Sequence, residues 1–171
     1  MGRIWAVLAV ALGLAFGQTA TAAAADWALL KAADAGFTAE LPGEAIHIGA
    51  EGDGPEQWLL VGGDGVYAIF LSPTGGAGAE IDERFLDTVL DNSVEALAGE
   101  VQQRWTTDGH GGRVRWARFA GQASNLTVEG QAIAIARPGT VLVAVALTPE
   151  GGDPANVARF LASVRIEAPV T

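Results

Sequence analysis

The chain of 171 residues is acidic, because 20 Asp and Glu residues outnumber 10 Lys and Arg residues and give a formal net charge of −10. An acidic surface repels phosphate groups, so neither nucleic acid nor an anionic membrane surface is expected as a partner. The chain has no cysteine, which excludes disulfides, lipoprotein attachment and thiolate metal ligands.

Residues 1–25 have the pattern of a secretory signal peptide. Arg3 is the only charged residue of this stretch, an apolar run covers 4–16, and Ala23-Ala24-Ala25 supplies an Ala-x-Ala exit. An uncleaved anchor is the alternative, but a membrane-spanning helix needs about 20 apolar residues. We therefore expect cleavage after Ala25, which leaves one domain, residues 26–171, with a net charge of −11. The single lysine and abundant Ala and Gly are typical of a GC-rich bacterial genome, so the expected location is periplasmic or secreted.

The first half of the domain predicts strands. Phe37–Leu41 alternates apolar and polar residues and stops at Pro42-Gly43, as a half-buried strand before a turn does. Two apolar runs, Gln57–Val61 and Val66–Ser72, are joined by the glycine-rich segment 62–65, which indicates a β-hairpin.

An amphipathic helix is predicted from about residue 81, with its end at Gly99. Its apolar stripe comprises Ile81, Phe85, Val89 and Leu97, widened by Leu86, Leu90 and Val94. The acidic residues of its first turn, which suit the positive end of a helix dipole, are Glu80, Asp82 and Glu83. We expect Phe85 to be a principal anchor of this helix on the sheet.

Four further strands follow in the second half. They are Val101–Thr107, Arg113–Ala120 after a loop at 108–112, and the hairpin Leu126–Arg137 and Val141–Thr148 with its turn at Pro138-Gly139. The run Val141–Leu147 is apolar without alternation, which indicates a strand covered on both faces.

A second helix and a closing strand complete the chain. Asp153 is suited to cap a helix and Pro154 to its first position. The apolar face of this helix is formed by Val157, Phe160 and Leu161, and Val164–Ile166 is the last strand. The pattern predicts an α+β fold in which one helix covers each face of an antiparallel sheet of about six to seven strands.

Three segments resemble the PsbP-like fold family. They are the opening Gly36-Phe37-Thr38-Ala39-Glu40-Leu41-Pro42-Gly43, the amphipathic helix after the first hairpin, and the ending Phe160-Leu161-Ala162-Ser163-Val164-Arg165-Ile166. The family includes the extrinsic protein of the photosynthetic oxygen-evolving complex, a nuclear import factor that binds Ran, and many small exported bacterial proteins of unknown function. The resemblance covers most of 27–167 and implies a non-enzymatic accessory or binding role. It transfers no functional residue.

No motif predicts a cofactor, a metal or a catalytic residue. The glycine-rich segment 75–80 lacks the spacing of a phosphate-binding loop, and acidic residues follow it. The only histidines, His47 and His110, belong to no metal-binding motif. A small exported hydrolase, with a carboxylate or histidine site assembled by the fold, remains the alternative to an accessory or binding domain.

One segment concentrates aromatic and basic residues, and it supplies the candidate binding residues Trp105, His110, Arg113 and Arg115. Trp and Arg are enriched at binding hot spots, so this segment is predicted to meet an unknown protein partner or a small anionic ligand. The alternative is that Trp116 belongs to the core and the arginines pair with acidic residues of the same molecule.

Overall fold

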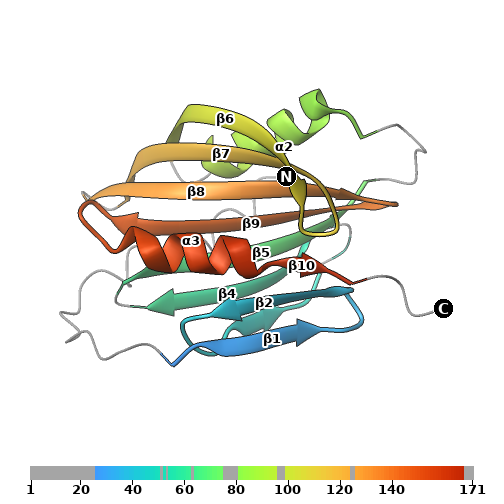
Figure 1. Cartoon of the computed structure of the whole chain (residues 1–171), viewed down its shortest axis with the longest axis horizontal. Coiled ribbons are helices and arrows are strands. Elements are labelled where there is room, and N and C mark those ends of the chain that lie inside the picture. Colours follow the sequence, from blue (N-terminus) through green and yellow to red (C-terminus); the bar gives the residue numbers. More distant parts are fainter. Residues whose placement is uncertain are drawn as a thin grey trace.

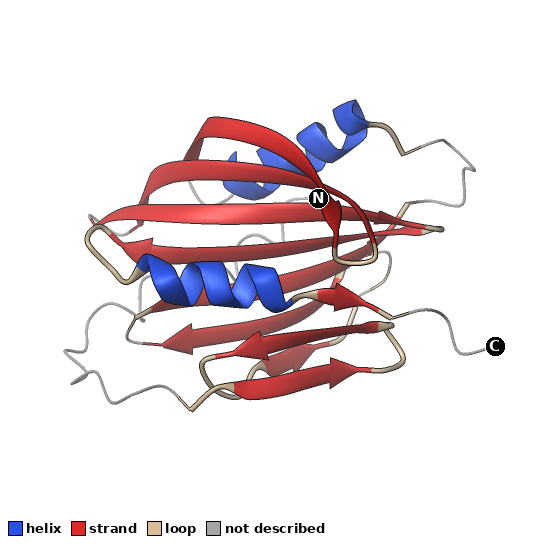
Figure 2. Ribbon diagram, viewed as in Figure 1, coloured by secondary structure: helices blue, strands red, loops and turns tan. Residues whose placement is uncertain are grey.

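The structure is a computed structural model that describes residues 26–50, 52, 54–62, 64–74, 81–95, 99–123 and 126–167. The predicted signal peptide and the glycine-rich segment 75–80 lie outside the described residues. The described part folds into two antiparallel sheets and two helices, so the predicted α+β class is confirmed (Figure 1 and Figure 2).

The larger sheet has seven strands. In spatial order they are β3 (Ile46–Ile48), β4 (Glu56–Gly62), β5 (Gly65–Pro73), β9 (Thr140–Pro149), β8 (Leu126–Arg137), β7 (Gly112–Ala123) and β6 (Gly99–Gly109). Each neighbouring pair is antiparallel. The hairpins predicted at 62–65 and at Pro138-Gly139 are the β4–β5 and β8–β9 connections.

Strand β9 is buried on both faces, as its continuous apolar run predicts. All eight residues from Val141 to Thr148 are buried. Its odd-numbered residues join the apolar cluster that contains Leu86 and Leu90, whereas its even-numbered residues join the cluster that contains Phe160. Strand β9 therefore divides the protein into two apolar layers.

Each layer is closed by one helix. Helix α2 (Glu83–Glu95) contacts β6, β7 and β8 on one face, and helix α3 (Pro154–Ser163) contacts β8, β9 and the smaller sheet on the other (Figure 1). The Asp153 carboxylate caps α3 by accepting from the Ala155 N–H at 2.9 Å, with Pro154 as the first helical residue. The predicted second helix and its cap are confirmed.

The smaller, three-stranded sheet is a correction to the single predicted sheet. It comprises β1 (Ala28–Ala32), β2 (Phe37–Leu41) and β10 (Arg165–Ile166), in the order β1-β2-β10. The alternation in β2 predicts that Phe37, Ala39 and Leu41 are buried, and they are. Alternation determines which face of a strand is buried but not which strand is its neighbour, so the second sheet could not be read from it.

The smaller sheet is tied to α3 by polar contacts. The Glu40 N–H of β2 donates to Ser163 Oγ at 2.7 Å, and Arg159 donates to the Glu40 carboxylate at 2.9 Å. Nearer the start of α3, the Asn156 carboxamide donates to the carboxylate of Asp64, which lies in the turn between β4 and β5. The Tyr67 hydroxyl donates to the same carboxylate. Burial, and then the Asp64 charge, raise the pKa of Tyr67 above its ordinary value, so this hydroxyl stays a donor.

Phe85 is not the core anchor of α2 that the sequence predicts. It is 41% exposed, and the buried stripe is instead Leu86, Leu90, Ser93 and Val94. Successive residues of an α-helix are rotated by about 100° around its axis. Glu83, Asp87 and Asp91 therefore form a row along one side of the buried stripe, and Phe85 lies on the other side. Ion pairs from this acidic row to the sheet hold that flank close, so Phe85 turns outward.

Substitution of two residues on α2 tests this orientation. Leu90→Ala is expected to lower the free energy of unfolding by roughly 2–5 kcal/mol, because it leaves a cavity in a fully buried layer. Phe85→Ala is expected to cost about 1 kcal/mol or less, because its ring is partly in water. Urea denaturation measures both values. A larger loss for Phe85→Ala than for Leu90→Ala would show that α2 is rotated differently.

Candidate functional site

The four candidate residues lie on two opposite faces of the β6–β7 hairpin. Trp105 is paired in register with Trp116 and lies on the α3 side of the sheet. Arg113 and Arg115 point to the other side, where their partners are on α2. The predicted cluster is therefore divided: an aromatic part on one face and a basic part on the other.

Arg115 is held inside the molecule. Its guanidinium donates to both carboxylate oxygens of Asp87, at 2.7 and 3.1 Å, and to Thr106 Oγ1 at 3.0 Å. Its side chain is only 16% exposed. The hydrogen bonds to Asp87 raise the pKa of Arg115 further above its ordinary value. Three of its five N–H donors are thus used within the molecule, and the two that bind Asp87 join α2 to the sheet.

Two further arginines extend this contact along α2. Arg113 lies 3.5 Å from the Glu83 carboxylate and is 65% exposed. Arg104 on β6 pairs with Asp87 at 3.6 Å and also with Asp91. The arrangement corresponds to the alternative that the sequence left open, in which the arginines pair with acidic residues of the same molecule.

The contribution of these pairs to stability should follow their exposure. Arg115→Met is expected to lower the free energy of unfolding by about 1–3 kcal/mol, because it removes charge-assisted hydrogen bonds in a largely water-excluded place. The matched variant Arg113→Met removes an exposed pair and should cost less than about 0.5 kcal/mol. Chemical denaturation of both variants checks this. Equal losses would mean that Asp87 does not fix Arg115.

The aromatic part forms a continuous surface on the α3 side. The rings of Trp105 and Trp116 stack with centroids 5.5 Å apart and an interplanar angle of 10°. The Trp116 indole N–H donates to Thr107 Oγ1 at 2.8 Å, and His110 lies edge-on to Trp116 at 5.8 Å. Trp105, Trp116 and His110 are each only half-buried. We call these three residues the aromatic surface.

His110 also belongs to a tight turn, where the sequence predicts only a loop at residues 108–112. The strands pair as far as Gly109 and Gly112, so the connection is a two-residue turn of His110 and Gly111 with φ values of 54° and 92°. Positive φ at both central residues is characteristic of a type I′ turn. The His110 Nδ1–H donates to the Val164 carbonyl at 2.7 Å, because a carbonyl can only accept. The His110 carbonyl accepts from the Ile166 N–H at 3.0 Å.

Burial lowers the pKa of His110 below its ordinary value of 6.5, the Arg165 charge lowers it further, and the hydrogen bond to Val164 opposes both. Between this lowered pKa and 6.5, the unfolded chain binds a proton that the folded protein excludes. Stability contributed by neutral His110 is therefore present above pH 6.5 and is lost as the pH falls below it.

The variant His110→Asn tests this pH dependence, because Asn tolerates positive φ and does not titrate. We expect the melting temperature of the wild type to fall more steeply than that of the variant between about pH 7.5 and 5. The slope, rather than the absolute stability, is the readout, since the variant also loses the bond to Val164. Parallel slopes would contradict the assignment.

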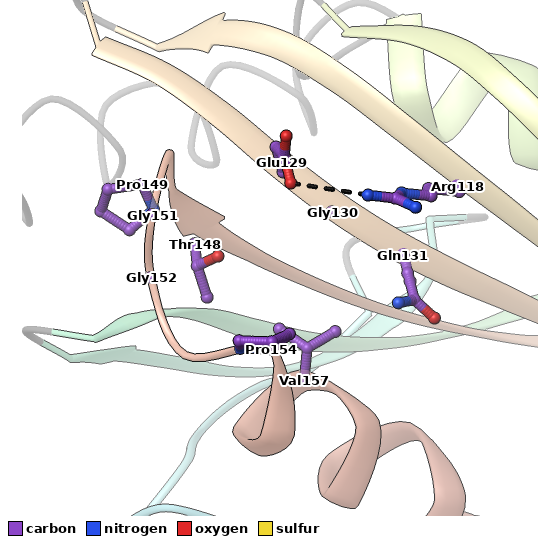
Figure 3. A pocket seen from close by; sticks show the side chains of 10 residues that line it. All are labelled: Arg118, Glu129, Gly130, Gln131, Thr148, Pro149, Gly151, Gly152, Pro154 and Val157. Carbon is purple, nitrogen blue, oxygen red and sulfur yellow. Dashed lines mark ion pairs between the residues drawn. The ribbon is translucent and has the colours of Figure 1, made fainter.

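A second surface feature lies beside the first turn of α3. A depression of about 210 Å³ is lined by Arg118, Glu129, Gly130, Gln131, Thr148, Pro149, Gly151, Gly152, Pro154 and Val157 (Figure 3). Arg118 and Glu129 form an exposed ion pair at its rim, 3.8 Å apart. No motif in the sequence marks this depression. The only available signal was that Gln131 directly precedes the apolar run 132–136 and Thr148 directly follows the apolar run 141–147.

The two histidines of the chain are not brought together. His47 is on β3 and His110 is at the end of β6, the two edge strands of the larger sheet. His47 stacks on Trp58 with centroids 4.7 Å apart. Within the described ranges, no group of three His, Cys, Asp or Glu residues is placed to hold a metal ion. No helix in the described part of the chain is long and apolar enough to cross a bilayer.

Comparison with solved structures identifies the fold. The solution structure of cyanobacterial PsbP (CyanoP) from Synechocystis sp. PCC 6803 matches with a TM-score of 0.59 and 15% identity, over 88% of this chain and 98% of that one. A protein of unknown function from Pseudomonas aeruginosa matches with a TM-score of 0.40 and 17% identity, over 77% of this chain and 86% of that one. No protein-family model and no curated sequence matches. The chain has a PsbP-like fold, as the resemblance in its sequence predicts.

Proposed function

We propose that this protein is an exported, non-catalytic accessory or binding domain, periplasmic or secreted, that contacts a protein partner through its aromatic surface. The signal-peptide pattern of residues 1–25 supports export. The observation that carries the binding role is the stacked pair of Trp105 and Trp116, two large aromatic side chains that are only partly buried.

The pair has the properties of an interaction site. Helix α3 packs on β2, β8 and β9, and beside it on β6 and β7 the side chains of Trp105 and Trp116 remain partly exposed (Figure 1). Trp116 is held by its hydrogen bond to Thr107 and by its contact with His110, and its ring stacks against that of Trp105. Because the rings are already ordered, a partner that covers them loses little conformational freedom in the tryptophans on binding.

The basic part of the predicted site is less suited to this role. Arg115 already donates three hydrogen bonds to Asp87 and Thr106 and is only 16% exposed, so little of it is accessible to a partner. Arg113 is exposed but faces the α2 side, away from Trp105. The proposal therefore retains Trp105 and His110 from the predicted residues and adds Trp116.

Site-specific photo-crosslinking in the native host tests the proposal. A photoreactive phenylalanine analogue at position 105 is expected to give a discrete adduct with one partner in the extracytoplasmic fraction. The same analogue at position 85, which is exposed on the opposite α2 side, is the matched control and should give none. Trp105→Ala should reduce recovery of the partner at least about tenfold, as loss of a hot-spot residue does.

Two results would contradict this assignment. One is an adduct formed from position 85 but not from position 105. The other is a Trp105→Ala protein that folds normally and recovers the partner as the wild type does. Circular dichroism melting of the variant separates loss of binding from loss of fold.

A further inference from the structure

We propose that the depression beside α3 is a binding site for a small neutral polyhydroxyl ligand, of the size and chemistry of one sugar ring. The site is distinct from the aromatic surface and needs no protein partner. Four polar side chains converge on it from three adjacent strands: Arg118 from β7, Glu129 and Gln131 from β8, and Thr148 from β9.

The strand register explains the convergence. Arg118 is paired across the sheet with Gln131, and Glu129 is paired with Thr148, so the four residues occupy two neighbouring rows on the α3 side. Figure 3 shows the Thr148 and Gln131 side chains between the Arg118–Glu129 pair and the first turn of α3. Groups on central strands of a sheet are held in place without a loop having to close over them.

The Thr148 hydroxyl is the observation that points to a ligand. Thr148 is only 6% exposed, yet its hydroxyl makes no hydrogen bond with any described residue. Every fully enclosed side-chain N or O atom of the described residues has a partner, so the Thr148 hydroxyl keeps some exposed area, and Thr148 is one of the residues that line the depression. A hydroxyl that is almost surrounded by protein atoms and makes no hydrogen bond within the protein can exchange its contact with water for a hydrogen bond to a ligand at little cost.

Gln131 provides a second set of unused groups. Its carboxamide, on a half-buried side chain, also makes no hydrogen bond with a described residue. It offers two donor hydrogens and an acceptor oxygen, while the Thr148 hydroxyl both donates and accepts. Opposite them, Pro154 and Val157 supply an apolar wall from the first turn of α3.

The charges of the site favour a neutral ligand. Arg118 and Glu129 cancel each other, so an anion would meet the Glu129 carboxylate and a cation would meet the Arg118 guanidinium. A polyol avoids this conflict, because each hydroxyl can accept from Arg118 or donate to Glu129. Guanidinium, carboxylate and carboxamide groups each present two coplanar polar atoms, which suit two adjacent hydroxyls.

The size of the site agrees with a single ring. The depression, with a volume of about 210 Å³, is large enough to hold several water molecules. A hexose, with a ring of C–H groups that can lie on Pro154 and Val157 and hydroxyls around its edge, displaces a volume of this order. A zwitterionic amino acid is less suited, because its two charges would engage only the rim pair and leave Thr148 and Gln131 unused.

The test is an NMR titration of the isotope-labelled protein with glucose, galactose, mannose and N-acetylglucosamine. At least one is expected to bind saturably, with a dissociation constant of about 1 mM or lower. The resonances that shift should be the Gln131 carboxamide and the backbone amides of Thr148, Gly151 and Gly152. Glycine, glutamate and inorganic phosphate, titrated in the same way, are the charged comparison ligands.

Two threonine variants make the test specific. Thr148→Val keeps the shape, removes the unpartnered hydroxyl, and is expected to weaken binding at least about tenfold without lowering the melting temperature. The matched control is Thr140→Val, the same change at the opposite end of β9, which should bind as the wild type does.

The proposal would be overturned if none of the four sugars shifted these resonances saturably up to about 50 mM. It would equally be overturned if glutamate, glycine or phosphate saturated the site instead, or if Thr148→Val and Thr140→Val bound the sugar equally well. Because purified protein is used, failure of the partner experiment at Trp105 has no bearing on this result.

Discussion

Burial of β9 on both faces is the constraint on which the rest of the structure depends. Eight consecutive buried residues require an apolar cover on both faces of the strand. Neighbouring strands of the same sheet flank β9 but do not cover its faces, so other elements must pack on them. Helix α2 supplies one cover, and α3 with the smaller sheet supplies the other. The candidate surfaces lie at the border of the α3 cover, where α3 packs on β8 and β9 and where Trp105 and Trp116 on β6 and β7 are only partly buried.

Charge is used differently on the two sides of the larger sheet. On the α2 side, Arg115 is largely enclosed and bound by Asp87, so the pair serves to orient a helix. On the α3 side, Arg118 and Glu129 are about half exposed and 3.8 Å apart, a geometry that contributes little to stability. Arg118 and Glu129 can therefore turn toward a ligand at small cost in free energy. For this reason we assign a structural role to the Arg115–Asp87 pair and a binding role to the Arg118–Glu129 pair.

The two proposed surfaces are neighbours on one rigid sheet. Trp116 and Arg118 are two residues apart on β7 and point to the same side, so about 7 Å separates the aromatic surface from the rim of the depression. The similarity to cyanobacterial PsbP concerns the fold, which does not fix what these surfaces bind. Both assignments therefore depend on side chains of this chain alone.

The sequence by itself determined the helices, nearly all strands of the larger sheet, the double burial of β9 and the Asp153 cap, because periodicity and capping are local properties. It did not determine which of two adjacent apolar stripes of α2 is central, and Phe85 was placed wrongly as a result. It also could not pair Arg115 with Asp87, or gather Arg118, Gln131 and Thr148 beside α3. Those contacts join residues far apart in the chain, so only strand order, register and helix docking in the tertiary structure decided them.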